Sequence, residues 1–263
     1  MARLITLLTD FGYRDNYVGV MKGVIAGICP EAQCIDLTHA VPPQAIASAQ
    51  FALLTAYPYF PADAVHLVVV DPGVGTPRQA IAVQTSRGYF VAPDNGVLTG
   101  VLQHETAIAA VALTHAAYWR SQTPSATFHG RDIFAPVAAH LANGAPLTAV
   151  GTAIDPATLV RLPGVPPERI ADGLKGQIQY IDTFGNAVTT IDAQRMAPED
   201  AQVQVGTAVI PLGRTYADAE PGHAIALIGS HGWLEIAVRE GSAQQQLSLT
   251  IGDEVVVQRS SQP

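Results

Sequence analysis

The chain has 263 residues, of which 48% are hydrophobic and 14% are charged. This length and composition are typical of one large or two ordinary globular domains, and they exclude a disordered chain. The net charge of −8 argues against non-specific nucleic-acid binding, which requires a basic surface.

The first half of the chain alternates strand-like and helix-like segments. Apolar runs, helical periodicity and stop signals predict the following elements: strand Leu4–Leu8, helix Tyr17–Ile28, strand Cys34–Leu37, helix Gln44–Tyr57, strands Val65–Val70, Ala80–Gln84 and Tyr89–Ala92, helix Asn95–Gln103, strand Ala107–Leu113 and helix Ile133–Ala142. Such alternation is typical of a mostly parallel sheet covered by helices. Residues 1–155 are therefore predicted to form an α/β domain.

The second half of the chain loses this alternation. Prolines gather between Gly151 and Gly173, and residues 156–173 are predicted to be a linker. Beyond the linker, short strand-like runs are separated by Gly, Asp and Ser turns: Gly176–Ile181, Ala187–Ile191, Gln202–Leu212, Ala224–Ile228, Trp233–Val238 and Gln246–Gln258. Residues 174–263 are therefore predicted to form a smaller, all-β, barrel-like domain.

The sequence favours a cytoplasmic protein with no bound metal and no membrane partner. Cys29 and Cys34 are its two cysteines, and they lack the second Cys or His pair of a zinc site, so two reduced thiols are expected. No apolar run reaches the roughly 18 residues needed to span a membrane. The apolar stretch near the N-terminus is also too short for a signal peptide.

Two carboxylates directly follow strand-like runs. Asp71 follows Val65–Val70, and Asp10 follows the run that begins at Leu4. Because ligands of open α/β sheets bind outside the carboxyl ends of strands, both are candidates for a polar site. Arg78 comes seven residues after Asp71, across a turn rich in Gly and Pro. A tight turn with a surface ion pair is the alternative explanation of this segment.

His129, just before the predicted helix Ile133–Ala142, is a further candidate for this polar site. No His-Glu-x-x-His pattern surrounds it, so a metal site is not supported. If His129 meets Asp71 and Arg78, the three groups are suited to holding and polarising a water. Arginine is permanently cationic and favours hydroxide, a carboxylate accepts a proton, and histidine does either near neutral pH. A structural or exposed histidine is the alternative.

Three short motifs do not carry their usual meaning here. Thr9-Asp10-Phe11-Gly12 contains the DFG triplet of protein kinases, but the other kinase motifs do not precede it. Gly73-Val74-Gly75 lacks the Gly-Lys-Ser/Thr of a phosphate-binding loop. Gly229-Ser230-His231-Gly232 lacks the nucleophile elbow of serine hydrolases, and it predicts either a β-turn or an anion-contacting nest.

In the second half, Asp182 and Asn186 flank a polar turn after a strand-like run. A carboxylate and an amide at this spacing are able to bind an ammonium group and the edge of a heterocycle. An ordinary Asx turn with glycine is the alternative.

Six motifs, in this order and spacing, resemble the family that contains the S-adenosyl-L-methionine (SAM) hydroxide adenosyltransferases and the nucleophilic fluorinase and chlorinase. They are Thr9-Asp10-Phe11-Gly12, Val70-Asp71-Pro72-Gly73-Val74-Gly75, Ala92-Pro93-Asp94-Asn95-Gly96, Thr127-Phe128-His129-Gly130-Arg131-Asp132, Ile181-Asp182-Thr183-Phe184-Gly185-Asn186, and Ile228-Gly229-Ser230 with Trp233-Leu234-Glu235-Ile236-Ala237-Val238. The resemblance runs through nearly the whole chain. It implies an N-terminal α/β domain, a C-terminal β-barrel-like domain, and a SAM hydrolase that forms adenosine and methionine.

In the hydrolase branch of this family, the positions matching Asp71, Arg78 and His129 hold the attacking water. The halogenases carry other residues there and an extra loop for which this chain has no room, so the hydrolase branch is favoured. A nucleophilic halogenase of SAM and a non-catalytic sensor of SAM or adenosine are the alternatives.

The resemblance also implies substrate-binding residues in both domains. They are Asp10 for the ribose hydroxyls, Phe184 and Tyr216 beside the adenine, Asn186 and the backbone near Val238 at its edge, and Asp182 and Ser230 on the methionine ammonium and carboxylate, with Asp15 and Tyr17 nearby. His231 is a departure, because the fluorinase has an arginine at this position. The family pattern further implies a homotrimer with active sites between subunits, SAM as substrate and no cofactor. No motif reads the configuration of the sulfonium.

Overall fold

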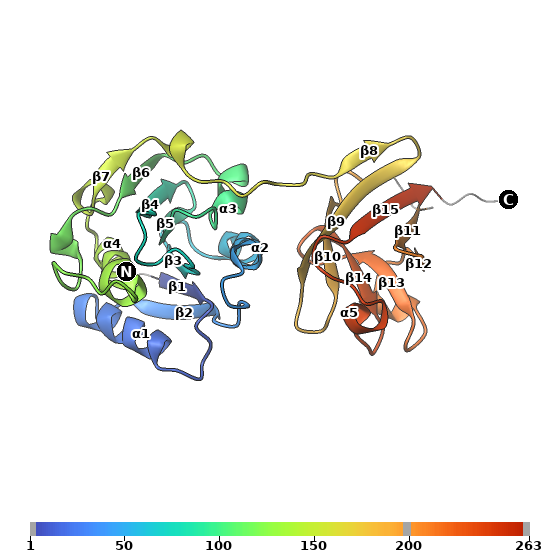
Figure 1. Cartoon of the computed structure of the whole chain (residues 1–263), viewed down its shortest axis with the longest axis horizontal. Coiled ribbons are helices and arrows are strands. Elements are labelled where there is room, and N and C mark those ends of the chain that lie inside the picture. Colours follow the sequence, from blue (N-terminus) through green and yellow to red (C-terminus); the bar gives the residue numbers. More distant parts are fainter. Residues whose placement is uncertain (1–3, 197–200, 260–263) are drawn as a thin grey trace. The chain divides into compact units, whose positions relative to one another are not determined.

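The computed structural model describes residues 4–196 and 201–259 of the chain. The chain divides into two compact units, residues 1–162 and 163–263 (Figure 1). The division lies inside the stretch 156–173, and strand β8 (Glu168–Ile170) already belongs to the second unit. The outer limits of the predicted domains, residues 1 and 263, lie outside the described residues.

Within residues 4–162, seven strands form one sheet in the order β2-β1-β3-β5-β4-β6-β7. The strands are β1 (Leu4–Thr9), β2 (Gln33–Thr38), β3 (Val65–Val69), β4 (Ala80–Thr85), β5 (Gly88–Pro93), β6 (Ala109–Ala112) and β7 (Thr152–Ile154). The pairs β1–β2, β1–β3 and β3–β5 are parallel, and the remaining pairs are antiparallel. The predicted α/β class is confirmed, with a mixed sheet. The short Ser86-Arg87 connection between β4 and β5 permits only an antiparallel pair.

Helices cover both faces of this sheet. One face carries α1 (Tyr17–Ile28) and α4 (Ala135–Ala142), and the other carries α2 (Ile46–Ala56) and α3 (Thr99–His104). A π-helical turn, η3 (Gly130–Phe134), precedes α4. Short 3₁₀ turns complete the connections: η1 (Tyr57–Tyr59), η2 (Ala116–Tyr118), η4 (Leu147–Ala149) and η5 (Pro156–Thr158).

In the described part of the second unit, eight strands form one antiparallel sheet in the order β12-β11-β15-β9-β10-β14-β13, with β8 paired to β9. The further elements are β9 (Gly173–Ile181), β10 (Ala187–Asp192), β11 (Ala201–Val205), β12 (Ala208–Pro211), η6 (Tyr216–Asp218), β13 (Ala224–Ile228), β14 (Trp233–Val238), α5 (Ala243–Gln246) and β15 (Glu254–Arg259). Leu212, just beyond β12, forms a bridge with Ala226 of β13. The two ends of the sheet therefore meet, and the predicted barrel-like form is confirmed.

Two predicted strand runs of this unit are interrupted. Gln202–Leu212 is a hairpin of β11 and β12, because Gly206 turns the chain with φ of 55°. The run from Gln246 to Gln258 begins at the end of α5, and its strand starts only after Gly252, which has φ of 97°. Both turns use the left-handed region that favours glycine. Across the described ranges, no helix is both long enough and apolar enough to cross a membrane.

Candidate active site

Parallel strands bring polar groups to one edge of the first unit's sheet. Asp10 directly follows β1, Asp71 comes two residues after β3, and Asn95 follows β5. These three strands are neighbours, so their carboxyl ends lie together. Asn95 ties two of the ends to each other, since its Nδ2 donates to the carbonyl oxygen of Val70 at 2.9 Å.

The turn after Asp71 folds Arg78 back onto that carboxylate. Arg78 Nε donates to Asp71 Oδ1 at 2.8 Å, and Arg78 Nη2 donates to Oδ2. The exposed fraction is 11% for the Arg78 side chain and 5% for that of Asp71. The pair is therefore a largely buried, bidentate contact, which is stronger and more directional than a surface ion pair.

Glycine is required within this turn. Gly75 has φ of +77°, and a Cβ at this position would lie 2.4 Å from the carbonyl oxygen of Ala126. Ala126 belongs to the segment that leads to His129. The turn and that segment are thus in direct backbone contact.

The substitution Gly75→Ala is expected to cost about 2–4 kcal/mol, because it combines left-handed strain with a collision that moves the Ala126 segment. Gly222→Ala is the matched control: its φ is +79°, but nothing lies within 4 Å of the added Cβ. The control should cost only about 1 kcal/mol. Denaturant unfolding of both variants measures the difference. Equal losses would show that the contact with Ala126 is unimportant.

Arg78 also reaches His129, which precedes η3. Arg78 Nη2 and His129 Nδ1 are 2.9 Å apart. A guanidinium has only donors, so Nδ1 must accept, and the proton of the neutral imidazole then resides on Nε2. The structure thus brings the three predicted residues Asp71, Arg78 and His129 into one hydrogen-bonded cluster with a defined histidine tautomer.

The surroundings keep His129 neutral. Burial and, next, the charge of Arg78 lower the pKa of His129, while the Asp71 and Asp132 carboxylates oppose this shift. The Arg78 guanidinium carbon also lies 5.2 Å from the centre of the Phe134 ring. This cation–π contact holds the guanidinium from the side of η3.

Asp132, which the sequence analysis did not single out, organises the segment around His129. It is 1% exposed. Its carboxylate accepts from Arg120 Nε at 2.5 Å, from Arg131 Nε and Nη2 at 2.7 Å each, and from the Ser125 N–H at 2.8 Å. The hydrogen bonds from Arg131, and then those from Arg120 and Ser125, lower the pKa of Asp132 despite its burial. The sequence signal that could have identified Asp132 is its position as a carboxylate directly before the apolar residues Ile133 and Phe134.

Asp10 is held at the same sheet edge by a second set of contacts. Its Oδ2 accepts the backbone N–H of Gln44 at 2.8 Å. His39, which is fully buried, has Nδ1 at 2.7 Å from Thr9 Oγ1 and Nε2 at 3.1 Å from Asp36 Oδ1. The His39 carbonyl accepts from the Gly12 N–H at 2.8 Å. His39 therefore fixes the loop on both sides of Asp10.

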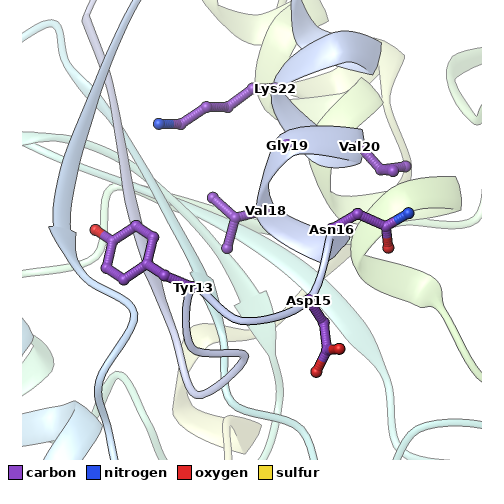
Figure 2. A pocket seen from close by; sticks show the side chains of 7 residues that line it. All are labelled: Tyr13, Asp15, Asn16, Val18, Gly19, Val20 and Lys22. Atoms are coloured by element: carbon purple, nitrogen blue, oxygen red, sulfur yellow. The ribbon is translucent and has the colours of Figure 1, made fainter.

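A surface pocket of about 470 Å³ lies beside α1. It is lined by Tyr13, Asp15, Asn16, Val18, Gly19, Val20 and Lys22 (Figure 2). Asp15 thus borders this pocket, whereas Tyr17 packs against Phe11 and Phe128, with ring centres 5.6 and 5.2 Å away. Asp71, Arg78 and His129 are not among the lining residues.

In the second unit, Asp182 and Asn186 hold each other in the turn after β9. Asp182 Oδ1 accepts the backbone N–H groups of Phe184 at 2.9 Å and Asn186 at 2.8 Å, and Oδ2 accepts from Asn186 Nδ2 at 3.0 Å. This is an Asx turn, and it leaves Phe184 76% exposed. The turn therefore presents an aromatic ring beside a carboxylate.

Tyr216 and His231 meet at Glu235, a second residue that the sequence analysis missed. The Tyr216 hydroxyl donates to Glu235 Oε1 at 2.7 Å, and His231 Nε2 lies 3.2 Å from Oε2. Ser230 is exposed in the turn before β14, and Val238 is buried at the end of β14. The predicted site residues thus form two sets, one in each unit.

Groups of three or more His, Cys, Asp or Glu that could hold a metal ion are absent from the described residues.

Comparison with known proteins gives a consistent result for both units. Residues 5–151 match the model of the SAM hydroxide adenosyltransferase N-terminal domain, and residues 176–256 match that of the C-terminal domain. The chain is 43% identical to a protein of Salinispora tropica and 42% identical to one of Thermus thermophilus, both named (R)-S-adenosyl-L-methionine hydrolase. The alignments cover 96% and 95% of this chain and 97% of each relative.

A more distant relative and a solved structure agree with this family assignment. A fluorinase of Nocardia brasiliensis is 28% identical, with 97% of this chain and 96% of the relative covered. The crystal structure of an uncharacterized conserved protein from Thermotoga maritima matches with a TM-score of 0.90 at 40% identity, covering 96% of this chain and 99% of that one. The chain therefore belongs to the SAM hydroxide adenosyltransferase family.

Proposed function

We propose that this protein hydrolyses SAM to adenosine and methionine, with water attacking C5′ of the ribose. The observation that carries the proposal is the cluster of Asp71, Arg78 and His129, largely buried at the carboxyl edge of the sheet. Relatives at 41–43% identity named (R)-S-adenosyl-L-methionine hydrolase support it. Their names also support the R epimer at sulfur as the substrate.

The reaction is an in-line displacement. The water oxygen bonds to C5′ while the C5′–S bond breaks, and the bonding pair leaves with sulfur as a neutral thioether. The water gives up one proton. Because a neutral thioether needs neither an acid nor electrons to depart, we propose that no cofactor takes part. Catalysis then consists of positioning the water and increasing its nucleophilicity.

The three residues of the cluster have different tasks. Arg78 occupies His129 Nδ1, so the imidazole offers its Nε2–H to the water oxygen. The Arg78 charge favours hydroxide over water. Asp71 accepts only two N–H bonds from Arg78, and its remaining lone pairs are available to take the proton.

The pH dependence of kcat/KM is expected to reflect the lowered pKa of His129. Protonation would place a second donor against Arg78, and it occurs only below the ordinary histidine pKa of about 6.5, because burial and the Arg78 charge oppose it. Activity should therefore hold as the pH falls through 6.5 and decline only at more acid values. Steady-state kinetics across this range measures it, and an acid limb centred at or above about 6.5 would contradict the assignment.

We further propose that SAM binds in a homotrimer, between the first unit of one subunit and the second unit of the next. Exposed aromatic rings on both units support this, since Tyr13 is 68% and Tyr17 45% exposed in the first unit, and Phe184 is 76% and Tyr216 46% exposed in the second. Purines are commonly bound against aromatic faces. Mixing an Arg78→Ala chain with a Phe184→Ala chain should give more activity than either chain has alone.

Within that site we assign the remaining contacts as follows. Asp10 binds the ribose hydroxyls, Asn186 and the Val238 backbone read the adenine edge, and Asp182 and Ser230 hold the methionine end, with Asp15, Tyr17 and His231 nearby. The exposed position of Ser230 and the carboxylate-bearing turn at Asp182 support these roles. The proposed location is the cytoplasm, where the free thiols Cys29 and Cys34 remain reduced.

The test is incubation with separated SAM epimers in H₂¹⁸O, followed by chromatography and mass spectrometry. We expect adenosine labelled at its 5′ oxygen, unlabelled methionine and faster turnover of the R epimer. Label in methionine, or S-adenosylhomocysteine as the product, would contradict the mechanism. A 5′-halo-5′-deoxyadenosine formed on adding chloride or fluoride would indicate a halogenase, and tight binding without product would indicate a sensor.

A further inference from the structure

Glu235 is a buried carboxylate in the middle of β14, and it is 4% exposed. Its two oxygens are used by different site residues: Oε1 by the Tyr216 hydroxyl at 2.7 Å and Oε2 by His231 Nε2 at 3.2 Å. Tyr216 and His231 come from different segments, η6 and the turn before β14. One side chain therefore connects two elements that carry proposed substrate contacts.

The hydrogen-bond directions of this network follow from the backbone. The Trp233 N–H donates to His231 Nδ1 at 3.2 Å, so Nδ1 is an acceptor and Nε2 carries the proton that faces Glu235. Burial alone would raise the pKa of Glu235, but the hydrogen bonds from His231 and Tyr216 outweigh it and lower the pKa. Burial and the contact with Glu235 raise the pKa of Tyr216 to about 12, so its hydroxyl remains a donor.

The space around this contact is closed by a glycine. A Cβ at Gly229 would lie 2.5 Å from His231 Cε1, 2.6 Å from His231 Nε2 and 2.9 Å from Glu235 Oε2. Any side chain at this position would separate the imidazole from the carboxylate. The contact of His231 with Glu235 therefore depends on Gly229 as well as on its own partners.

The Tyr216 ring is restrained at both ends. Asp218 accepts the backbone N–H groups of Arg214 at 2.8 Å and Thr215 at 3.1 Å, which fixes the segment that carries Tyr216. Glu235 holds the hydroxyl at the far end of the ring. The ring nevertheless remains 46% exposed. A rigid, partly exposed aromatic ring is a preorganised platform that loses little conformational entropy when a planar ligand binds.

A purely structural explanation of Glu235 is weak. A buried carboxylate costs desolvation free energy, and apolar side chains of similar volume often stabilise a core as well or better. Leu234 and Ile236, next to Glu235 along β14, point to the opposite face of the sheet. On its own face, Glu235 lies among buried apolar residues, with Ala237 on the same strand and Leu227 paired with it on β13. A charge in these surroundings is best explained by what it holds in place.

We propose that Glu235 is the positioning residue of the second unit's substrate-binding face, setting Tyr216 and His231 for the adenosine and methionine parts of SAM. This inference rests on the proposed function. Glu235 does not touch the reacting atoms, so its loss should weaken binding and leave the chemical step nearly unchanged.

The test compares three single variants. Glu235→Ala should raise KM for SAM and the Kd of adenosine about tenfold to a hundredfold, with kcat changed less than about threefold, because two polar groups lose their partner. Glu235→Gln should restore most of the affinity, since its amide can accept from His231 and donate to Tyr216. Glu254→Gln is the matched control, because it removes the same charge from the exposed ion pair with Lys175.

Several outcomes would overturn the inference. They are a folded Glu235→Ala variant with unchanged KM and Kd, a loss confined to kcat, or a Gln variant as impaired as the Ala variant. If Glu235→Ala does not fold, Tyr216→Phe is measured in its place. It removes only the hydroxyl, so it should also raise KM and Kd, and unchanged values would reject the role. Adenosine binding by calorimetry does not depend on turnover, so the inference is testable even if the wild-type chain fails to hydrolyse SAM.

Discussion

Arg78→Ala is expected to lower kcat for SAM hydrolysis by about 10²–10⁴-fold, with a smaller change in KM. Arg78 donates to both Asp71 and His129, so its loss separates the two groups that orient the water. It also removes the charge that favours hydroxide. Steady-state kinetics with a discontinuous adenosine assay measures the effect.

Two further variants show whether the expected loss of kcat comes from the geometry of the Arg78 guanidinium or from its charge. Arg78→Lys keeps the charge but lacks the planar fork, and we expect it to recover only a small part of the rate. Arg87→Ala is the control within the same unit. Arg87 directly precedes β5, so it lies away from the carboxyl edge of the sheet, and it donates to the Pro58 carbonyl. Its kcat should match that of the wild type. A Lys variant with full activity would show that the fork is unnecessary.

Asp132→Ala is expected to lower the free energy of unfolding by about 3 kcal/mol, the lower end of the range for broken buried ion pairs. The lower end applies because the partner side chains, Arg120 and Arg131, are 46% and 30% exposed. The Ser125 N–H loses its acceptor as well. Since these contacts shape the segment before His129, kcat should fall together with stability.

The matched control is Asp192→Ala, which removes a surface ion pair with Arg195 and should cost less than about 1 kcal/mol. The pKa of Asp132 is lowered in the folded state, so its contribution is fully present above about pH 3.9 and is lost as the pH falls below that value. The difference between Asp132→Ala and the wild type should therefore shrink in acid. Urea unfolding at neutral and acid pH measures this, and a loss that stays constant would exclude the carboxylate charge as its source.

The sequence was sufficient for the local elements and for the identity of the central cluster. The apolar run ending at Asp71 is a buried strand, β3, and the Gly/Pro turn does return Arg78 to the carboxylate. Both follow from local chemistry, since a buried parallel strand reads as an apolar run and a turn with glycine at positive φ has a narrow choice of geometry. The six motifs then identified the family, which the comparisons confirm.

The networks that hold the site residues were beyond sequence reasoning. Glu235 alternates with apolar neighbours along a strand, a pattern that predicts an ordinary outward-facing residue. In the structure it is buried, and Tyr216 and His231 contact it from other segments. The partners of Asp132 and His39 were overlooked for the same reason. Arg120 lies 12 residues from Asp132 and Thr9 lies 30 residues from His39, so each pair is brought together by the folded chain.

By itself, the sequence determined the two-part architecture, the family and the residue types of the Asp71–Arg78–His129 cluster, because these depend on hydrophobic periodicity, turn chemistry and motif order. The tertiary structure decided the mixed pairing of the sheet, the tautomer of His129 and the carboxylates that hold each set of site residues in place. These depend on which donors and acceptors meet across long stretches of chain, and a hydrogen bond between distant residues forms only once folding brings both of its partners together.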